Sequence, residues 1–189
     1  EILSLEEMAA EFDLHKVHKA GARFSKEKAE WFNHQYLQKQ SNEELLESFK
    51  NLEETKNINL SDEKLLKIIG LMKERATFVK DIYAQGKFFF EAPASYDEKA
   101  VKKAWNEETA SIMTELSEKL NTTEFKSEIL KEEIHHFVEE KGLGFGKVMM
   151  PLRLALVGEL KGPDVPDLLE ILGKEESLTR LKLAIEKIK

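Results

Sequence analysis

The sequence has no cysteine and only four prolines, and none of its apolar runs approaches the roughly 20 residues that cross a bilayer. The absence of cysteine excludes a disulfide scaffold, cysteine-ligated zinc, iron–sulfur clusters and thiol catalysis. The chain also has no signal peptide, and it begins at Glu1 without a methionine. We therefore expect a cytoplasmic protein that has no membrane partner and that is a piece of a longer chain.

The composition is that of a folded, acidic protein. Its 189 residues are 41% apolar, which is too many for a disordered chain and enough for a buried core. The net charge is −7, and the charge is unevenly distributed along the chain. Residues 1–140 carry 20 basic and 29 acidic side chains, whereas residues 141–189 carry nine basic and seven acidic ones. An acidic protein is a poor general binder of nucleic acid, so we expect no DNA partner, although a local patch can still hold a phosphate backbone.

Nearly every local pattern is helical. Ser4 with Glu7, and Ser41 with Glu44, have the spacing of a capping box. Further serine caps are expected at Ser25, Ser61 and Ser95. Apolar residues then recur with a period near 3.6 in four stripes, which are Leu65, Leu66, Ile69 and Met72; Val101, Trp105, Ile112, Met113, Leu116 and Leu120; Leu130, Ile134, Phe137 and Val138; and Leu178, Leu181, Ile185 and Ile188. We find no strand-like alternation, so the predicted fold class is all-α.

Turn-forming residues divide the expected helices into two groups. The segment Glu91–Ser95 follows three consecutive phenylalanines and precedes a new helical pattern. We place a boundary there, which predicts a helical bundle of two subdomains, residues 1–92 and 93–189. Two glycines and two prolines between Gly158 and Pro166 predict a stiff, exposed loop between two helices.

The aromatic residues Phe88–Phe90, Trp31, Trp105 and Tyr96 allow two interpretations. Aromatic rings form stacking platforms in proteins that bind single-stranded nucleic acid. Three adjacent rings cannot all stack on one ligand, however, and large aromatic residues are mostly buried. We therefore expect these side chains to pack in the core or at helix ends.

The stretch Glu132–His136 contains Glu-x-x-His twice, in overlapping form. On a helix, this spacing places a carboxylate and an imidazole one turn apart, as in the di-iron sites of helical bundles. Such a site needs the motif on two helices, and no second Glu-x-x-His occurs elsewhere in the chain. A solvated helix face is the favoured interpretation, and a helical-bundle metalloenzyme that uses Glu133 and His136 is an alternative.

Arginine is rare. The chain has 25 lysines and four arginines, which are Arg23, Arg75, Arg153 and Arg180. The planar guanidinium binds carboxylates, phosphates and base edges through paired hydrogen bonds, which lysine cannot do. Arg153 lies in an apolar helix start that begins at Pro151, just before the expected loop. A charge among apolar neighbours is unfavourable unless a partner binds it, so Arg153 is a candidate binding residue.

Three stretches near the C-terminus form a recognisable pattern, namely Pro151-Leu152-Arg153-Leu154-Ala155-Leu156-Val157-Gly158, Gly162-Pro163 and Leu172-Gly173-Lys174-Glu175. Together they resemble the C-terminal signature of a known family, the bacterial glutamyl-tRNA synthetases. The opening resembles the segment after that family's catalytic core, through Gly21-Ala22-Arg23-Phe24, Lys28, Trp31, Asn33 and Tyr36-Leu37, and the middle through Phe88-Phe89-Phe90 and Tyr96-Asp97. The catalytic motifs His-Ile-Gly-His and Lys-Met-Ser-Lys-Ser do not occur, so we expect no catalytic residue in this chain.

The resemblance implies an anticodon-binding domain of the class I aminoacyl-tRNA synthetase type. Arg153 would contact an anticodon base, and Gly162, Pro163 and Val165 would pack against the anticodon. Arg75, expected at the start of a helix over Glu74–Ile82, would match the arginine that recognises the third anticodon base, a C.

The resemblance also implies a partner and a parent enzyme. The partner is the anticodon arm of glutamate tRNA. The parent attaches glutamate to that tRNA, with a catalytic domain N-terminal to residue 1. ATP and magnesium belong to that domain and no cofactor to this chain. We expect a monomer. A second alternative, from a different class, is a helical adaptor that binds another protein through an exposed apolar surface.

Overall fold

The computed structural model describes residues 2–17, 21 and 23–188, and these residues form helices and no β-strand. The all-α prediction is confirmed. The α-helices are α1 (Leu5–Glu11), α2 (Lys26–Lys39), α3 (Asn42–Lys50), α4 (Asp62–Lys73), α5 (Val79–Gln85), α6 (Glu98–Ala104), α7 (Thr109–Thr122), α8 (Ser127–Glu140), α9 (Phe145–Val157), α10 (Val165–Leu172) and α11 (Lys174–Lys187). Short 3₁₀ turns are η1 (Leu14–Lys16), η2 (Glu53–Thr55) and η3 (Lys87–Phe89). No helix in these ranges has the length and apolar character that a membrane span requires.

Side-chain caps determine where several helices begin. The two predicted capping boxes form at the start of α1 and of α3, and the serines before α2 and α4 also cap their helices. The capping serines are Ser4, Ser25, Ser41 and Ser61. Each hydroxyl accepts a hydrogen bond from a backbone N–H that has no partner inside the helix.

The prediction that Ser95 caps a helix is wrong. The N-cap of α6 is Asp97, whose carboxylate accepts a hydrogen bond from the backbone N–H of Ala100 at 2.8 Å. The backbone N–H of Asp97 donates to the carbonyl of Gly158, also at 2.8 Å. This bond to another part of the chain keeps Ser95 outside the helix, so α6 begins only at Glu98.

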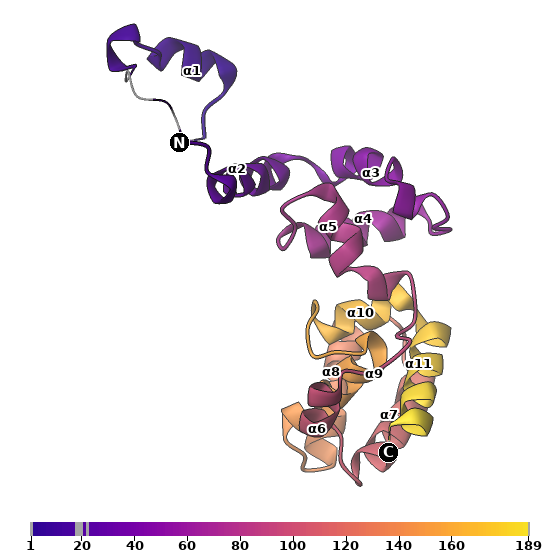
Figure 1. The fold of residues 1–189 in the computed structure, drawn as a ribbon. Helices are drawn as coiled ribbons and strands as arrows, with labels where there is room; N and C mark the ends of the chain where they lie inside the picture. Colours follow the sequence, from indigo (N-terminus) through magenta and orange to yellow (C-terminus); the bar gives the residue numbers. More distant parts are fainter. Residues whose placement is uncertain (1, 18–20, 22, 189) are drawn as a thin grey trace.

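The helices lie in two groups (Figure 1). In the first group α3, α4 and α5 pack together, and in the second α11 lies along α7 and α9 while α8 contacts α10. α1 has no buried residue and lies far from the second group. The boundary expected between residues 92 and 93 falls in the connection between η3 and α6. The division into two subdomains stays a prediction.

The buried apolar side chains form one core that includes both groups. The cluster contains Phe49 and Ile68 from the first group and Leu152 and Leu169 from the second. α10 contacts both α4 and η3, which places it at the junction. An ion pair across the same junction joins Lys67 Nζ on α4 to Glu170 Oε1 on α10 at 2.8 Å.

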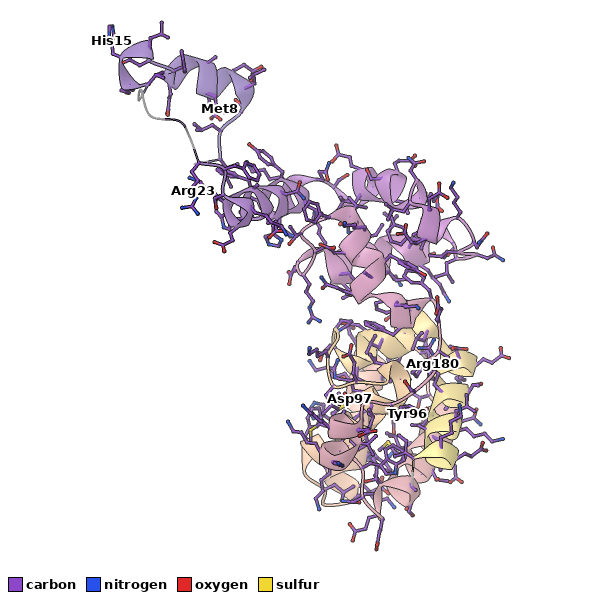
Figure 2. The ribbon with its side chains drawn as sticks, in the orientation of Figure 1. Met8, His15, Arg23, Tyr96, Asp97 and Arg180 are labelled. Atoms are coloured by element: carbon purple, nitrogen blue, oxygen red, sulfur yellow. The ribbon has the colours of Figure 1, made fainter. Side chains whose placement is uncertain are left out.

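Arg180 on α11 joins the two groups from inside the core; Figure 2 labels its position. It is only 2% exposed. Its Nη1 donates hydrogen bonds to the carbonyls of Phe88 in η3 at 2.7 Å and Leu156 in α9 at 2.8 Å. Its Nε bonds the carboxylate of Glu176 at 2.6 Å. One guanidinium therefore connects η3, α9 and α11.

The helix that carries Arg153 begins earlier than predicted. α9 starts at Phe145, so Pro151 lies inside the helix and not at its start. Proline has no N–H, and the carbonyl of Lys147 therefore lacks its usual helical partner. Val148 and Leu152, on either side of the proline, are fully buried, and the helix continues through this position.

The predicted start of the helix over Glu74–Ile82 is also wrong. α4 ends at Lys73 and α5 begins at Val79, so Arg75 lies in the connection between them. The carboxylate of Asp81 accepts hydrogen bonds from the backbone N–H groups of Thr77 and Phe78, at 3.0 and 2.8 Å. These bonds fix the start of α5 after Phe78.

Candidate nucleic-acid interface

A groove of about 710 Å³ lies between the end of the first helix group and the loop after α9. Its first wall consists of Met72, Arg75, Ala84, Gln85 and Phe88, and its second wall consists of Arg153, Glu159, Leu160, Lys161 and Gly162. The fold thus brings three of the predicted site residues, Arg75, Arg153 and Gly162, to one open surface.

Arg153 is half-buried in the second wall, and its Nη1 donates a hydrogen bond to the backbone carbonyl of Pro163. Within the described ranges, the side chain forms no ion pair with a carboxylate. Burial lowers the pKa of its guanidinium, the carboxylate of Asp164 opposes this effect, and the positive charge of Arg75 adds to the lowering. Arginine nevertheless stays charged in proteins, so two cations share this groove.

The loop between α9 and α10 depends on two glycines with positive φ. Gly158 ends α9 at φ +86°, and a Cβ there would lie 2.8 Å from the carbonyl oxygen of Ser95. Gly162 has φ +136°, and a Cβ there would lie 3.3 Å from Nη1 of Arg153. Residues with a side chain rarely adopt these conformations, so both glycines are needed for the observed loop.

Pro163 and Val165 occupy a different place from the predicted one. The segment Gly158–Pro166 is not exposed throughout, because Pro163 is buried and Val165 is the fully buried first residue of α10. Neither residue lines the groove. Both side chains are buried and support the loop from within the core.

The aromatic residues follow the core interpretation, with one exception. Phe88, Phe89 and Trp105 are buried, and the rings of Phe88 and Phe89 lie 4.7 Å apart between centroids. Phe88 nevertheless lines the groove beside Gly162. Trp31 is 45% exposed, so the expectation of core packing is wrong for that residue.

Several groove residues were not predicted from the sequence. Gln85 donates a hydrogen bond from Nε2 to the backbone carbonyl of Arg75 at 3.3 Å, and Lys161 lies in the loop beside Gly162. Gln85 occupies an ordinary position at the end of an amphipathic helix, which carries no signal. Lys161 could have been found, because it is the basic residue inside the glycine- and proline-rich loop.

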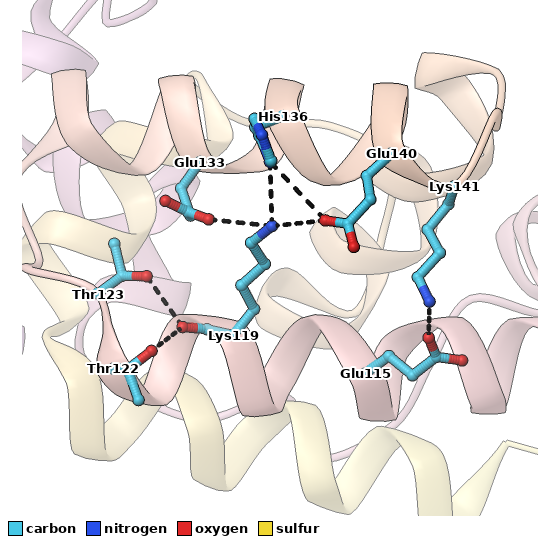
Figure 3. A network of polar contacts seen from close by, with 8 residues as sticks. All are labelled: Glu115, Lys119, Thr122, Thr123, Glu133, His136, Glu140 and Lys141. Atoms are coloured by element: carbon cyan, nitrogen blue, oxygen red, sulfur yellow. Dashed lines mark hydrogen bonds and ion pairs between the residues drawn. The ribbon is translucent and has the colours of Figure 1, made fainter.

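Glu133 and His136 do not form a metal site in this structure. Figure 3 shows the ammonium of Lys119, on α7, between their side chains and that of Glu140 on α8. Lys119 Nζ lies 3.2 Å from Glu133, 3.2 Å from Nδ1 of His136 and 3.0 Å from Glu140. The hydrogen bond from Lys119 lowers the pKa of Glu140. Within the described ranges, no group of three potential ligands could hold a metal ion. In this structure the Glu-x-x-His spacing serves an ion network between two helices, which gives the metalloenzyme alternative no support.

The adaptor alternative predicts an exposed apolar surface, and among the described residues exposed large apolar side chains lie mainly near the start of the chain. Most of the large apolar side chains that are exposed in the described ranges come from α1, η1, α2 and their connections. They are Leu5, Met8, Phe12, Leu14, Val17, Phe24, Trp31 and Tyr36. Figure 2 labels Met8 in this region, far from Arg180 in the second helix group.

Comparison with known proteins defines the class of this chain. Residues 30–185 match the family model described as an anticodon binding domain. The match covers most of the chain, including both walls of the groove. The chain therefore belongs to the anticodon-binding domain family.

The individual relatives are more specific. The chain is 44% identical over 190 residues to a glutamate–tRNA ligase of Christiangramia forsetii and 47% identical over 186 residues to one of Flavobacterium johnsoniae. It covers 38% and 37% of these relatives, while they match 100% and 98% of it. The chain thus spans less than half the length of the curated relatives it matches.

Solved structures give the same result. The chain is 67% identical, with a TM-score of 0.95, to a crystal structure of a glutamate tRNA ligase from Elizabethkingia meningosepticum in complex with its amino acid. That match covers 100% of this chain and 38% of the other. A glutamate-tRNA synthetase structure from Elizabethkingia anophelis is 66% identical, with a TM-score of 0.91, over 98% of this chain and 37% of the other. The resemblance inferred from the sequence is confirmed.

Proposed function

We propose that this chain binds the anticodon arm of glutamate tRNA and distinguishes its bases in the groove between Arg75 and Arg153. One observation supports this most directly. Two of the four arginines, far apart in the sequence, line a single groove, and neither is neutralised by an ion pair among the described residues. An acidic chain with two unpaired guanidinium groups in one hollow is suited to a local anionic, hydrogen-bonding ligand.

The chemistry of single-stranded RNA fits this groove. Bases in an anticodon loop are unstacked enough to expose edges that a duplex hides. Cytosine offers acceptors at O2 and N3, whereas uracil carries an N–H at N3, so a fixed guanidinium favours cytosine. A good bidentate contact discriminates between bases by about 1–3 kcal/mol, which corresponds to about a tenfold preference or more.

Each site residue has a distinct role in this proposal. Arg75 contacts the third anticodon base, and Arg153 contacts a neighbouring base from the opposite wall. Gly162 lets the backbone approach the ligand closely, because it has no side chain. Pro163 and Val165 act indirectly, since the carbonyl of Pro163 orients Arg153 and Val165 anchors the loop in the core.

The relatives indicate the wider setting. They are glutamate–tRNA ligases, and this chain corresponds to their C-terminal portion. We infer that the parent protein attaches glutamate to its tRNA in a catalytic domain N-terminal to residue 1, where ATP and magnesium act. We also infer a cytoplasmic, monomeric parent.

Binding of short RNA hairpins tests the proposal. The probe is the anticodon stem and loop of glutamate tRNA, labelled with a fluorophore, with C or U as the third anticodon base. We expect the chain to prefer C by about tenfold, Arg75→Ala to lose this preference, and Arg153→Ala to weaken binding of both hairpins. Lys182→Ala is the control, because Lys182 is exposed on α11 and does not line the groove. Equal binding of both hairpins by the unaltered chain would contradict the proposal.

A further inference from the structure

A second hollow of about 300 Å³ adjoins the groove on the far side of the loop after α9. α6 and its cap contribute Asp97, Lys99, Ala100 and Lys103, and the loop contributes Glu159, Leu160 and Lys161. These three loop residues also line the groove that contains Arg75 and Arg153. A ligand in the groove can therefore extend over the loop into the second hollow without leaving the protein surface.

The lysines of this hollow are available for a ligand. Among the described residues, Lys99, Lys103 and Lys161 form no ion pair, and all three are exposed. Other lysines are paired, for example Lys67 with Glu170 and Lys141 with Glu115. In a chain with a net charge of −7, this hollow and the groove together gather five cationic side chains against Asp97 and Glu159.

Backbone contacts fix the hollow in place beside the groove. The N–H of Asp97 donates to the carbonyl of Gly158 at 2.8 Å, so the start of α6 is attached to the start of the loop. Gly158 also packs so closely on Pro93 that a Cβ would lie 2.9 Å from the proline Cβ. The carboxylate of Asp97 caps α6 through the N–H of Ala100, and it forms no ion pair with the lysines of the hollow among the described residues.

We propose that Lys99, Lys103 and Lys161 bind the phosphate groups of the nucleotides that flank the bases held by Arg75 and Arg153. This inference rests on the proposed function, because it takes its ligand from the adjoining groove. A lysine ammonium is a point charge on a flexible stem, which suits phosphate oxygens and carries no base preference. The two hollows thus have different roles. The arginine groove distinguishes bases, and the lysine hollow supplies affinity that does not depend on the RNA sequence.

The salt dependence of binding separates these two contributions. Each phosphate contact releases counterions, so binding to single-stranded RNA weakens with salt at a slope of about 0.7 per contact in logarithmic units. We expect the double variant Lys99→Ala with Lys103→Ala to lower this slope by about 1 to 1.5. Affinity at low salt falls by about tenfold for the C and U hairpins alike, so the preference for C is unchanged.

Matched variants complete the experiment. Lys99→Arg with Lys103→Arg keeps the charges and is expected to retain the slope, and Lys182→Ala removes a lysine of α11 without changing it. An unchanged slope in the double alanine variant overturns the inference, while a preference for C in the same measurement leaves the proposed function intact. Loss of the preference in the double variant also overturns it, because the lysines would then contact bases. If the unaltered chain has no preference for C, that result contradicts the proposed function, and the inference that rests on it falls as well.

Discussion

At the scale of single residues, the groove depends on a glycine, because a Cβ at this position would crowd the Arg153 side chain. Gly162 has no Cβ, and Nη1 of Arg153 occupies the adjoining space, 3.3 Å from where that carbon would be. The same guanidinium is oriented by the carbonyl of the next residue, Pro163. The direction of the Arg153 side chain is therefore set by the loop backbone and not by an acidic partner.

Gly162→Ala tests this dependence. Alanine at φ +136° is strained, and its methyl group would press on the guanidinium of Arg153, which would have to shift. We expect the free energy of unfolding to fall by about 1–2 kcal/mol and hairpin binding to weaken by about tenfold. Urea unfolding and hairpin binding measure the two effects.

The matched control is Gly146→Ala. Gly146 lies inside α9, where a Cβ would make an ordinary 3.5 Å contact with Met150. Alanine should stabilise this helix by about 0.5–1 kcal/mol and leave hairpin binding unchanged. If both variants behave alike, the conformation of Gly162 is not what orients Arg153.

At the scale of elements, a carboxylate holds three helices together. Glu170 on α10 forms an ion pair with Lys67 on α4 at 2.8 Å. Its carboxylate also accepts a hydrogen bond from the backbone N–H of Ser127, at the start of α8, at 2.6 Å. The bond from Lys67 contributes most to lowering the pKa of Glu170, and the Ser127 bond adds to it. The ionised form of this side chain is therefore the one that stabilises the junction.

Glu170→Gln is expected to change the response to acid. A carboxyl whose pKa is lowered by folding stabilises the protein above its unfolded pKa of about 4.3, and this stabilisation is lost as the pH falls through the lower, folded pKa. At pH 7 the variant should be less stable by about 1 kcal/mol, and the difference should vanish in strong acid. Urea unfolding from pH 7 to pH 2.5 measures it.

Glu63→Gln provides the comparison, because Glu63 contacts the same lysine at 3.9 Å but is 83% exposed. It should have little effect at any pH. A Glu170→Gln difference that stays constant from neutral to acidic pH would mean that its charge is not what joins the helices.

At the scale of the whole molecule, local patterns predicted the helices and failed at the places where distant segments meet. Ser41 and Glu44 form a capping box from residues three positions apart, so the sequence alone could indicate it. Arg180 follows Glu176 by four residues, which is the pattern of a surface ion pair. It is instead buried, and it donates hydrogen bonds to the carbonyls of Phe88 and Leu156, which are distant in the sequence.

In the candidate site, too, local sequence patterns did not indicate which distant segments meet. Arg153 was identified from its apolar neighbours and Arg75 through the family resemblance, but the proximity of Gln85 and Lys161 depends on how α5 and the loop pack. The resemblance implied that Val165 packs against the anticodon, and the glycines and prolines from Gly158 to Pro166 predicted an exposed loop. The loop instead folds back onto the core, and Val165 becomes fully buried.

Arg180→Met tests how the two helix groups are joined. Methionine fills similar space but leaves the carbonyls of Phe88 and Leu156 without a donor, so we expect a loss of about 3 kcal/mol in the free energy of unfolding. Lys182→Ala, on the exposed face of the same helix, should change stability by less than about 0.5 kcal/mol. Apolar replacement of buried charges sometimes stabilises proteins, and a more stable Arg180→Met variant would show that this guanidinium does not secure the junction.

The continuous core has a consequence for how fast a ligand is captured. Because the same buried cluster supports α4, η3 and α9, the walls that carry Arg75 and Arg153 cannot separate without exposing it to water. The cations are thus held at their spacing before any RNA arrives, and little free energy is spent on ordering the protein. Association should consequently follow a single exponential, with no slow rearrangement after the first encounter.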